Sequence, residues 1–343
     1  MNSKLKCVLV GCGSISDSWR RGAGGMEGLT MAGFVDLDLT AAHKSAAAWN
    51  AAAATVSDDL AATLRRVQPD VVFNCTVPEA HHDVTLTALA HGAHVLGEKP
   101  LANNMEEARL MVEAAEAAGR LFAVIQNRRY NSNIRRLRAF LASGVLGQLT
   151  TVNSDFYIGA HFGGFRDSMP HVLLADMAIH TFDAARYLTA TEAQSVYCHE
   201  WNPAGSWYQG DASAVAVFQM SGGIVYTYRG SWCSEGLHTS WEGDWRIVGT
   251  RGSVTWDGAA VFRAQVTRGD EGFMRPLADV ALPEIAVPPE QTGGHGGLIR
   301  DFLRAVREGG SVETVASDNI HSLAMVHAAI DSAASKMPVD VHA

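Results

Sequence analysis

The stretch Val95-Leu96-Gly97-Glu98-Lys99-Pro100-Leu101 predicts a short buried strand that runs into a turn. Pro100 has no backbone N–H and favours an extended residue before it, so we expect the strand to stop at Lys99. A helix with apolar residues at helical spacing follows and ends at Gly119. Lys99 then lies at the carboxyl end of a strand, where ligands bind in open α/β sheets. Spacing alone leaves open a second interpretation, in which Glu98 and Lys99 form a solvated charge pair.

The N-terminal residues predict a second ligand-binding turn of the same kind. Residues 5–10 indicate a buried strand, and Gly11-Cys12-Gly13-Ser14-Ile15-Ser16 follows it. This is the G-x-G-x-x-[G/A] pattern with serine in third place, in which the first glycine permits a tight turn and the second lets the backbone approach a pyrophosphate. The glycine-rich residues 21–25 predict a mobile loop that interrupts the next helix beside the cofactor.

The next strand, at residues 33–35, ends at Asp36. A carboxylate at this position can accept both hydroxyl protons of an adenosine ribose and would repel a 2′-phosphate. It therefore predicts NAD as the cofactor rather than NADP. The alternative is that Asp36 or Asp38 caps the alanine-rich helix expected at about 40–53.

The order of the segments predicts the fold class, an α/β chain of two domains. Strands at 71–76, 95–99 and 121–126 alternate with helices, which is typical of a Rossmann domain with a doubly wound parallel sheet, at residues 1–126. Residues 127–343 change in character and predict a substrate-binding and oligomerisation domain of α/β type with a large, mostly antiparallel, open-faced sheet. Its clearest strand is the alternating Ile224–Arg229, with further strands near 213–220, 244–248 and 253–256 and a helix at 132–143.

Composition excludes several classes of protein. The 343 residues carry a net charge of −9 and are 47% hydrophobic, which predicts a folded protein that does not bind nucleic acid. The basic cluster Arg135, Arg136 and Arg138 is expected on the outer face of a helix. We expect no membrane segment, because there is no long apolar run, and we expect no signal peptide. The five cysteines are scattered, so we expect no disulfide scaffold, and we expect no metal site. The expected compartment is the cytoplasm.

A single helix, Leu173–Leu188, holds the second candidate group. Asp176 and His180 are four residues apart and Asp183 is three further on, so an α-helix would place all three on one face. A carboxylate one turn from a histidine can orient the ring for general base catalysis. An ordinary exposed helix pair has the same spacing, and that interpretation stays open from the residues alone.

Taken in order, these motifs resemble the Gfo/Idh/MocA oxidoreductase family, named for glucose–fructose oxidoreductase, inositol dehydrogenase and a rhizopine-catabolism protein. The resemblance runs nearly end to end. It is carried by the Gly11–Ser16 loop, Thr76…His81, Glu98-Lys99-Pro100, Asp176-x-x-x-His180, Gly249–Ser253 and two final helices at about 295–308 and 317–335.

The resemblance implies an NAD-dependent dehydrogenase that acts on CH–OH groups of a sugar, inositol or related polyol. It implies that Lys99, Asp176 and His180 are catalytic, with Lys99 or His180 as the proton acceptor. The cofactor-binding residues that it implies are Gly11, Gly13, Ser14, Ile15, Asp36, Thr76, His81, Glu98 and Lys99. Alternatives are an NAD-dependent glycosidase that works by transient oxidation and a non-catalytic ligand-sensing regulator of the same fold.

One departure from the family pattern concerns the substrate. Met169-Pro170-His171 stands where many relatives have a run of glycines, which predicts an altered pocket wall. The residues that we expect to contact substrate are Tyr157, His161, Arg166, His171 and His295. The open sheet face, with tryptophans at 232, 241, 245 and 256 nearby, predicts a homodimer or homotetramer.

Overall fold

The computed structural model describes residues 4–343, and these form two compact units. Unit 1 comprises the chain up to Tyr130 together with Val287–Ile320, and unit 2 comprises Asn131–Ala286 and His321–Ala343. Residues 1–3, the start of the segment expected to lack a signal peptide, lie outside the described part. No helix among residues 4–343 has the length and apolar character that crossing a membrane requires.

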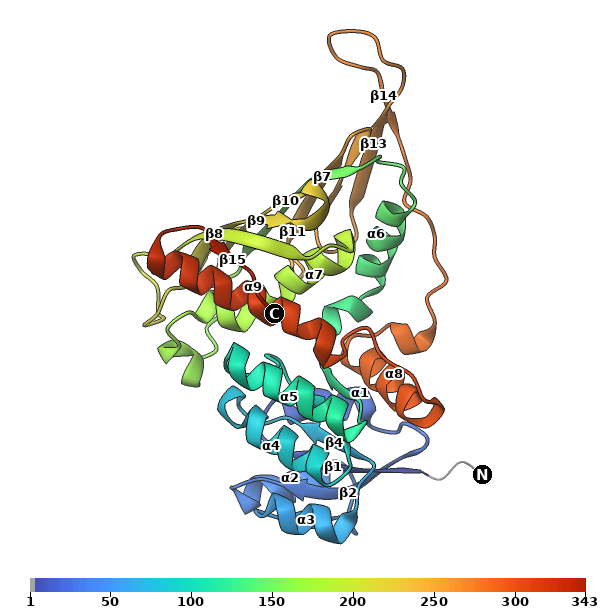
Figure 1. Cartoon of the computed structure of the whole chain (residues 1–343), viewed down its shortest axis with the longest axis vertical. Coiled ribbons are helices and arrows are strands. Elements are labelled where there is room, and N and C mark those ends of the chain that lie inside the picture. The colour runs from blue at the N-terminus through green and yellow to red at the C-terminus, as the bar shows by residue number, and fades with distance from the viewer. Residues whose placement is uncertain (1–3) are drawn as a thin grey trace. The chain divides into compact units, whose positions relative to one another are not determined.

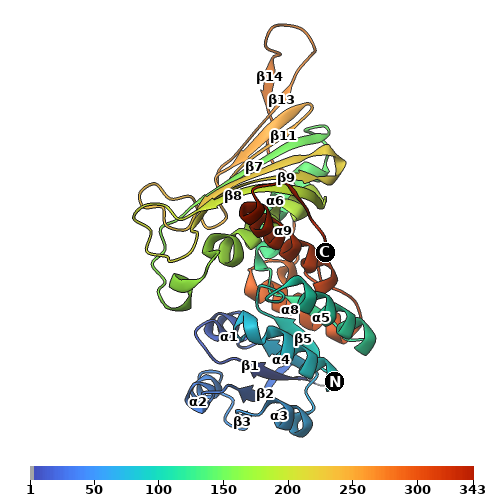
Figure 2. The same cartoon turned by 60° about the vertical axis from the view of Figure 1, so that its left-hand side comes forward.

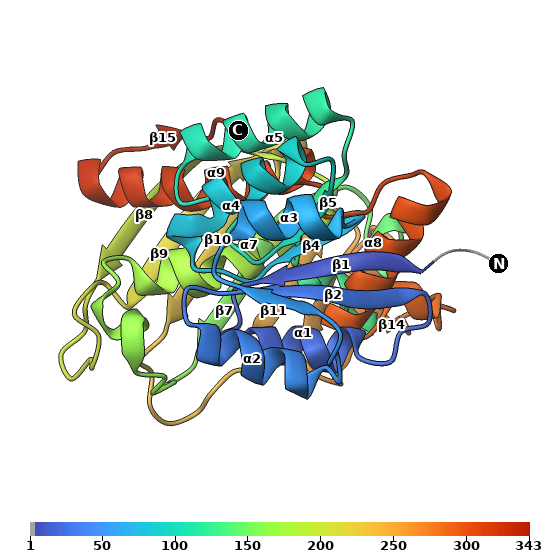
Figure 3. The same cartoon turned by 90° about the horizontal axis from the view of Figure 1, so that it is seen from below.

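Unit 1 is a six-stranded, fully parallel sheet of order β3-β2-β1-β4-β5-β6. Helices α1 and α2 cover one face and α3, α4 and α5 cover the other (Figure 3). The strands are β1 (Leu5–Val10), β2 (Leu29–Val35), β3 (Thr55–Ser57), β4 (Val71–Asn74), β5 (His94–Gly97) and β6 (Phe122–Val124). The helices are α1 (Ser16–Ala23), α2 (Leu39–Ala48), α3 (Leu60–Val67), α4 (Pro78–Ala90) and α5 (Met105–Ala118). The predicted Rossmann sheet is confirmed.

A late segment of the chain completes unit 1, which differs from the expected division at residues 126 and 127. Helix α8 (His295–Glu308) buries Leu298 and Phe302 in the same hydrophobic core as Trp19 and Phe34. Burial of such large apolar side chains favours this pairing. The second domain is therefore not the whole of residues 127–343, because Val287–Ile320 packs with unit 1.

The glycines near residue 22 explain how α8 packs so closely. A Cβ atom on Gly22 would lie 3.1 Å from the backbone nitrogen of Gly296, so the two helices approach closely where each has a glycine. Helix α1 continues through Gly22 and ends at Ala23. The predicted interruption of the helix does not occur at residues 21–23, although the helix ends before Gly24 and Gly25. The mobility expected of this stretch stays a prediction.

Unit 2 is built on a nine-stranded sheet of order β14-β13-β12-β11-β7-β10-β9-β8-β15, in which only the pairing of β7 with β10 is parallel. Its strands are β7 (Leu149–Tyr157), β8 (Ala193–Trp201), β9 (Ser213–Met220), β10 (Val225–Ser231), β11 (Asp244–Gly249), β12 (Gly252–Trp256), β13 (Phe262–Thr267), β14 (Leu277–Asp279) and β15 (Val339–Asp340). The predicted large, mostly antiparallel sheet is confirmed.

Helices cover one face of this sheet and the described residues leave the other open (Figures 1 and 2). The helices of unit 2 are α6 (Ser132–Ala142), α7 (Ile179–Thr189) and the part of α9 (Ala316–Ser335) that starts at His321. Strand β10 alternates as expected, with Tyr226 and Tyr228 fully buried and Thr227 and Arg229 on the open face.

The arginine cluster of α6, which was expected on the outer face of the helix, packs against other parts of unit 2. Arg135 is 8% exposed. Arg138 lies over the Tyr187 ring, at 3.9 Å from its centroid, and Arg136 donates to the Leu282 carbonyl oxygen. These side chains pack their stems and stack their guanidinium groups, and so they contribute to the fold of unit 2.

Candidate active site

The glycine loop of unit 1 has the geometry that a dinucleotide needs. Gly11 has a φ of +86°, and a Cβ atom there would lie 2.6 Å from the carbonyl of Cys75. A Cβ on Gly13 would meet no atom within 4 Å, so the backbone here is open to a ligand. Ser14 and Ile15 are exposed beside it, and no side chain caps the amino end of α1. An uncapped helix start beside such a loop suits a phosphate group.

Asp36 follows β2 directly and is fixed by two backbone amides. Its Oδ2 accepts a hydrogen bond from the Cys12 amide at 2.6 Å, and its Oδ1 accepts one from the Asp38 amide at 2.9 Å. Each carboxylate oxygen keeps a second lone pair, so the side chain can still accept ribose hydroxyl protons. The capping role belongs to Asp38, whose Oδ1 accepts from the Thr40 amide at the start of α2.

The turn after β5 is held by a buried carboxylate. Glu98 is 6% exposed, and its Oε1 accepts from the Trp19 indole N–H at 2.6 Å. Its Oε2 accepts from the Lys99 amide at 3.2 Å. The interpretation of Glu98 and Lys99 as a solvated charge pair is wrong, because the carboxylate is buried and bonded within unit 1. Glu98 therefore positions the backbone of Lys99.

The predicted cofactor residues Thr76 and His81 contact the protein itself. The His81 ring nitrogens lie 2.8 Å from the Pro100 carbonyl oxygen and 3.1 Å from that of Thr76. Burial lowers the pKa of His81. The Thr76 hydroxyl donates to Asn74 Oδ1 at 2.6 Å. This places the two residues at the base of the Lys99 turn, where they join the ends of β4 and β5.

His295, expected as a substrate contact, begins α8 in unit 1. Its Nδ1 lies 2.9 Å from the Asn127 amide nitrogen, and its Nε2 lies 3.9 Å from Glu98 Oε1. Burial, with a smaller contribution from the Arg21 charge, lowers the pKa of His295 to about 4 in spite of the nearby carboxylate. The imidazole is therefore neutral at pH 7.

In unit 2, the helix expected at Leu173–Leu188 has two parts. A π-helical segment, η3 (Leu173–Ala178), contains Asp176, and α7 begins at Ile179 and contains His180. π-Helical turns are rare and are frequent at functional sites. The assumption of one uniform α-helical face fails at Asp183, which is fully buried and accepts from the Ser322 hydroxyl at 2.8 Å.

Asp176 is held by an arginine from the preceding loop. Arg166 Nε donates to Asp176 Oδ2 at 2.7 Å, and its Nη2 reaches Oδ1 at 3.3 Å. Arg166 lies in the short 3-10 helix η2 (Gly164–Ser168), and its guanidinium stacks on Phe162 and Phe165. Asp176 is 8% exposed, so this two-point contact fixes a buried carboxylate four residues before His180.

The other expected substrate contacts lie in unit 2 and contact neighbouring protein groups. Tyr157 ends β7, where its amide donates to Thr239 Oγ1 at 3.1 Å. His161 stacks on Trp207 and lies 2.8 Å from Glu235. His171 lies 2.7 Å from Glu200. Arg166 is thus the member of the expected group that contacts a predicted catalytic side chain.

Sequence reasoning missed the loop that faces this segment, at residues 202–212. Its Trp207 and Tyr208 both donate to the Ala160 carbonyl oxygen, at 3.2 and 2.6 Å. A Cβ on Gly210 would overlap the carbonyl groups of Met169 and Pro170. The available signal was the concentration of aromatic, glycine and acidic residues in Trp207-Tyr208-Gln209-Gly210-Asp211.

Comparison with known proteins agrees with this geometry. Residues 5–126 match the model of the oxidoreductase family with an NAD-binding Rossmann fold, and residues 134–255 match the GFO/IDH/MocA C-terminal domain. D-glucoside 3-dehydrogenase from Escherichia coli is 31% identical over 60% of each chain. Inositol 2-dehydrogenase from Rhizobium meliloti is 24% identical over 97% of this chain and 98% of its own.

A solved structure shares the whole fold. An oxidoreductase from Agrobacterium radiobacter in complex with NAD+, L-tartaric acid and magnesium superposes with a TM-score of 0.85 at 23% identity, over 99% of each chain. Family membership is indicated by the two matched domains. NAD binding is indicated by the glycine loop at Gly11 and by the acid at the end of β2. The chain belongs to the Gfo/Idh/MocA family of oxidoreductases and binds NAD.

Proposed function

We propose that this protein oxidises a carbinol carbon of a sugar, inositol or related polyol and passes the hydride to NAD. The observation that carries the proposal is the fixed carboxylate of Asp176, held by Arg166 four residues before His180, in a chain that also holds a dinucleotide loop and Lys99. Its dehydrogenase relatives act on a glucoside and on inositol, which supports this substrate class. Bound NAD supplies the hydride acceptor.

The reaction needs a base, because the alcohol loses a hydride from carbon and a proton from oxygen to become a ketone. His180 accepts the hydroxyl proton in this proposal, and Asp176 supports its ring. Lys99 donates to the substrate oxygen and stabilises its developing negative charge. Arg166 is a positioning residue that fixes Asp176.

The test is a panel of sugars, inositols and glycosides, varied in stereochemistry and followed by NADH absorbance. The proposal predicts that one group of substrates yields one NADH for each carbinol oxidised. Release of free sugar from a glycoside without net NADH would instead support the glycosidase. Binding of a sugar without NADH formation or glycoside cleavage would support the sensor.

We infer that the enzyme prefers NAD to NADP. The carboxylate of Asp36 is held by Cys12 and Asp38 where an adenosine 2′-phosphate would meet it, and like charges repel. Fluorescence titration is expected to give much tighter binding of NAD, and Asp36→Ala is expected to narrow the difference. Equal affinities of the native protein for the two cofactors would contradict the inference.

We also infer that the open face of the unit 2 sheet joins copies of this chain. Three of the tryptophans expected there, at 232, 245 and 256, are instead buried, at 3% exposure or less. The face has an apolar part, where Tyr197 on β8 pairs with Val217 on β9, both more than a third exposed. Light scattering of native protein is expected to give a dimer or tetramer, and a Val217→Asp variant to give smaller species. A monomeric native protein at micromolar concentration would refute this.

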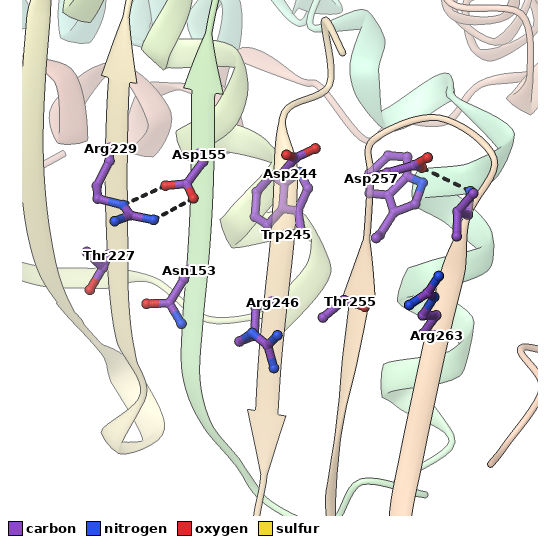
Figure 4. A pocket seen from close by; sticks show the side chains of 12 residues that line it. Asn153, Asp155, Thr227, Arg229, Asp244, Trp245, Arg246, Thr255, Asp257 and Arg263 are labelled. Carbon is purple, nitrogen blue, oxygen red and sulfur yellow. Dashed lines mark hydrogen bonds and ion pairs between the residues drawn. The ribbon is translucent and has the colours of Figure 1, made fainter. Parts of the chain in front are cut away.

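A second part of the open face carries charged and polar side chains. A recess of about 670 Å³ lies over β7 and β10–β13, and Figure 4 shows the double contact of Arg229 with Asp155 at 2.6 and 2.7 Å. Arg246 and Arg263 also line it (Figure 4). Mixed charge of this kind gives an interface specificity more than affinity.

A further inference from the structure

Three side chains that can ligate a metal meet on one side of unit 2. His171 lies just before the π-helical segment η3, Glu200 is near the end of β8, and Asp211 precedes β9. Each offers one ligand atom, and these atoms lie within 4.8 Å of one another. A first-row metal ion has ligand bonds of about 2.0–2.2 Å, so small movements of these side chains would let one ion bind all three.

The backbone holds two of these residues, His171 and Asp211, on adjacent segments. The Asp211 amide donates to the Pro170 carbonyl oxygen at 2.8 Å, and the Gln209 amide donates to the Asp167 carbonyl oxygen at 2.8 Å. Gly210 lies between the two bonds, where a Cβ atom would overlap both neighbouring carbonyl groups. The positions of His171 and Asp211 are therefore built into the loop pair and do not depend on side-chain contacts alone.

The burial of Glu200 is a second observation, independent of the grouping of the three side chains, that indicates a bound ligand. Its side chain is only 1% exposed, and its Oε2 lies 2.7 Å from His171 Nδ1. Its other oxygen, Oε1, is buried and has no hydrogen-bond partner among the residues that the structure describes. A buried carboxylate oxygen without a partner is unfavourable, whereas a bound cation would satisfy it.

We propose that His171, Glu200 and Asp211 bind a divalent metal ion of the zinc class. The mixture of one imidazole nitrogen and two carboxylates suits Zn²⁺, while Mg²⁺ prefers an all-oxygen shell with several waters. The His171 side chain is 33% exposed, which gives the ion a path to the buried Glu200.

Such an ion would tie three segments of unit 2 at one point. His171 is five residues before Asp176 in the chain, so the ion would fix the start of η3, and Asp211 would fix the loop that packs on Met169 and Pro170. The inference does not rest on hydride transfer. It would hold for an enzyme or for a sensor, and metal binding alone tests it.

The experiment is a Zn²⁺ titration of the full-length, tag-free protein after treatment with a chelator, followed by calorimetry and by thermal unfolding. We expect one equivalent of Zn²⁺ to bind and to raise the unfolding temperature, with Mg²⁺ binding at least about a hundredfold more weakly. Glu200→Gln and Asp211→Asn are each expected to weaken Zn²⁺ binding at least about tenfold.

The chain supplies a matched control in a second histidine–glutamate pair. His161 and Glu235 also lie 2.8 Å apart, but their side chains are 60% and 66% exposed and the pair belongs to no metal-binding group among the described residues. Glu235→Gln is expected to bind Zn²⁺ as the native protein does. Asp211→Asn changes a partly exposed side chain, and NAD titration reports whether each variant is folded.

Two results would overturn the proposal. The first is a native protein that takes up no stoichiometric Zn²⁺ and shows no rise in unfolding temperature. The second is equal Zn²⁺ affinity in the native protein and in folded Glu200→Gln and Asp211→Asn variants. In either case the three residues form a hydrogen-bonded cluster, and the buried oxygen of Glu200 has another explanation.

Discussion

Two buried carboxylates, Glu98 in unit 1 and Asp176 in unit 2, are held in different ways. Two uncharged groups, the Trp19 indole and the Lys99 amide, donate to Glu98 and fix its carboxylate in place. A guanidinium holds Asp176 at two points, so its charge is balanced by Arg166. The difference shows that one chain can use a buried acid as an anchor for a turn or as half of an ion pair.

Removal of the partner should therefore cost more at Asp176 than at Glu98. Arg166→Ala takes a full positive charge from a carboxylate that is 8% exposed, and we expect the free energy of unfolding of unit 2 to fall by about 3 kcal/mol. Arg166→Lys keeps the charge but loses the two-point contact. Its free energy of unfolding should therefore lie between that of the native protein and that of Arg166→Ala. Urea denaturation followed by tryptophan fluorescence measures the free energy of unfolding. A decrease of less than about 1 kcal/mol in Arg166→Ala would show that the ion pair adds little stability.

A neutral histidine, His295, lies near Glu98, and a change of pH tests that environment. Because burial and Arg21 lower the pKa of His295 to about 4, against 6.5 ordinarily, the unfolded chain binds its proton more readily. The stability from neutral His295 is complete above about pH 6.5 and is lost as the pH falls toward 4.

Between pH 7 and pH 5 this loss should be about 2 kcal/mol of unfolding free energy, at about 1.4 kcal/mol per pKa unit. A His295→Gln variant cannot take up the proton, so its stability should fall by correspondingly less over the same range. Denaturation curves at the two pH values give the comparison. Equal pH dependence in both proteins would show that the folded state protonates His295 as readily as the unfolded chain does.

The smallest effect is expected from removing the hydrogen bond between the Trp19 indole and Glu98. Trp19→Phe keeps most of the aromatic packing on Phe73 and removes the N–H that Glu98 Oε1 accepts. We expect it to lower the free energy of unfolding of unit 1 by about 1–2 kcal/mol. A loss larger than that of Arg166→Ala would reverse the comparison of the two carboxylates.

Helices and strands with a clear apolar period or with recognisable end residues were predictable, because interactions between nearby residues determine them. Helix α8 has the bounds His295–Glu308 that were expected, and Asn104 and Gly119 begin and end α5. The alternation of β10 likewise appears in the sequence, since one face of the strand is packed and the other is polar.

Contacts between distant residues were not predictable in this way. The return of α8 to unit 1 depends on Gly22 and Gly296, which are far apart in the chain. The partner of Asp176 is Arg166 on a separate short helix, and the π-helical turn changes which residues share a face. Arg135 was expected on the outer face of a helix, yet it is buried in unit 2.

The central claim is that Lys99 and His180 handle the proton while NAD accepts the hydride. The measurement is turnover of the best substrate by Lys99→Ala and His180→Ala, with cofactor binding followed by fluorescence in the same samples. We expect each variant to lose at least about a hundredfold in turnover while NAD still binds. If both variants bind NAD and oxidise the substrate at near-native turnover, this protein is not the dehydrogenase described.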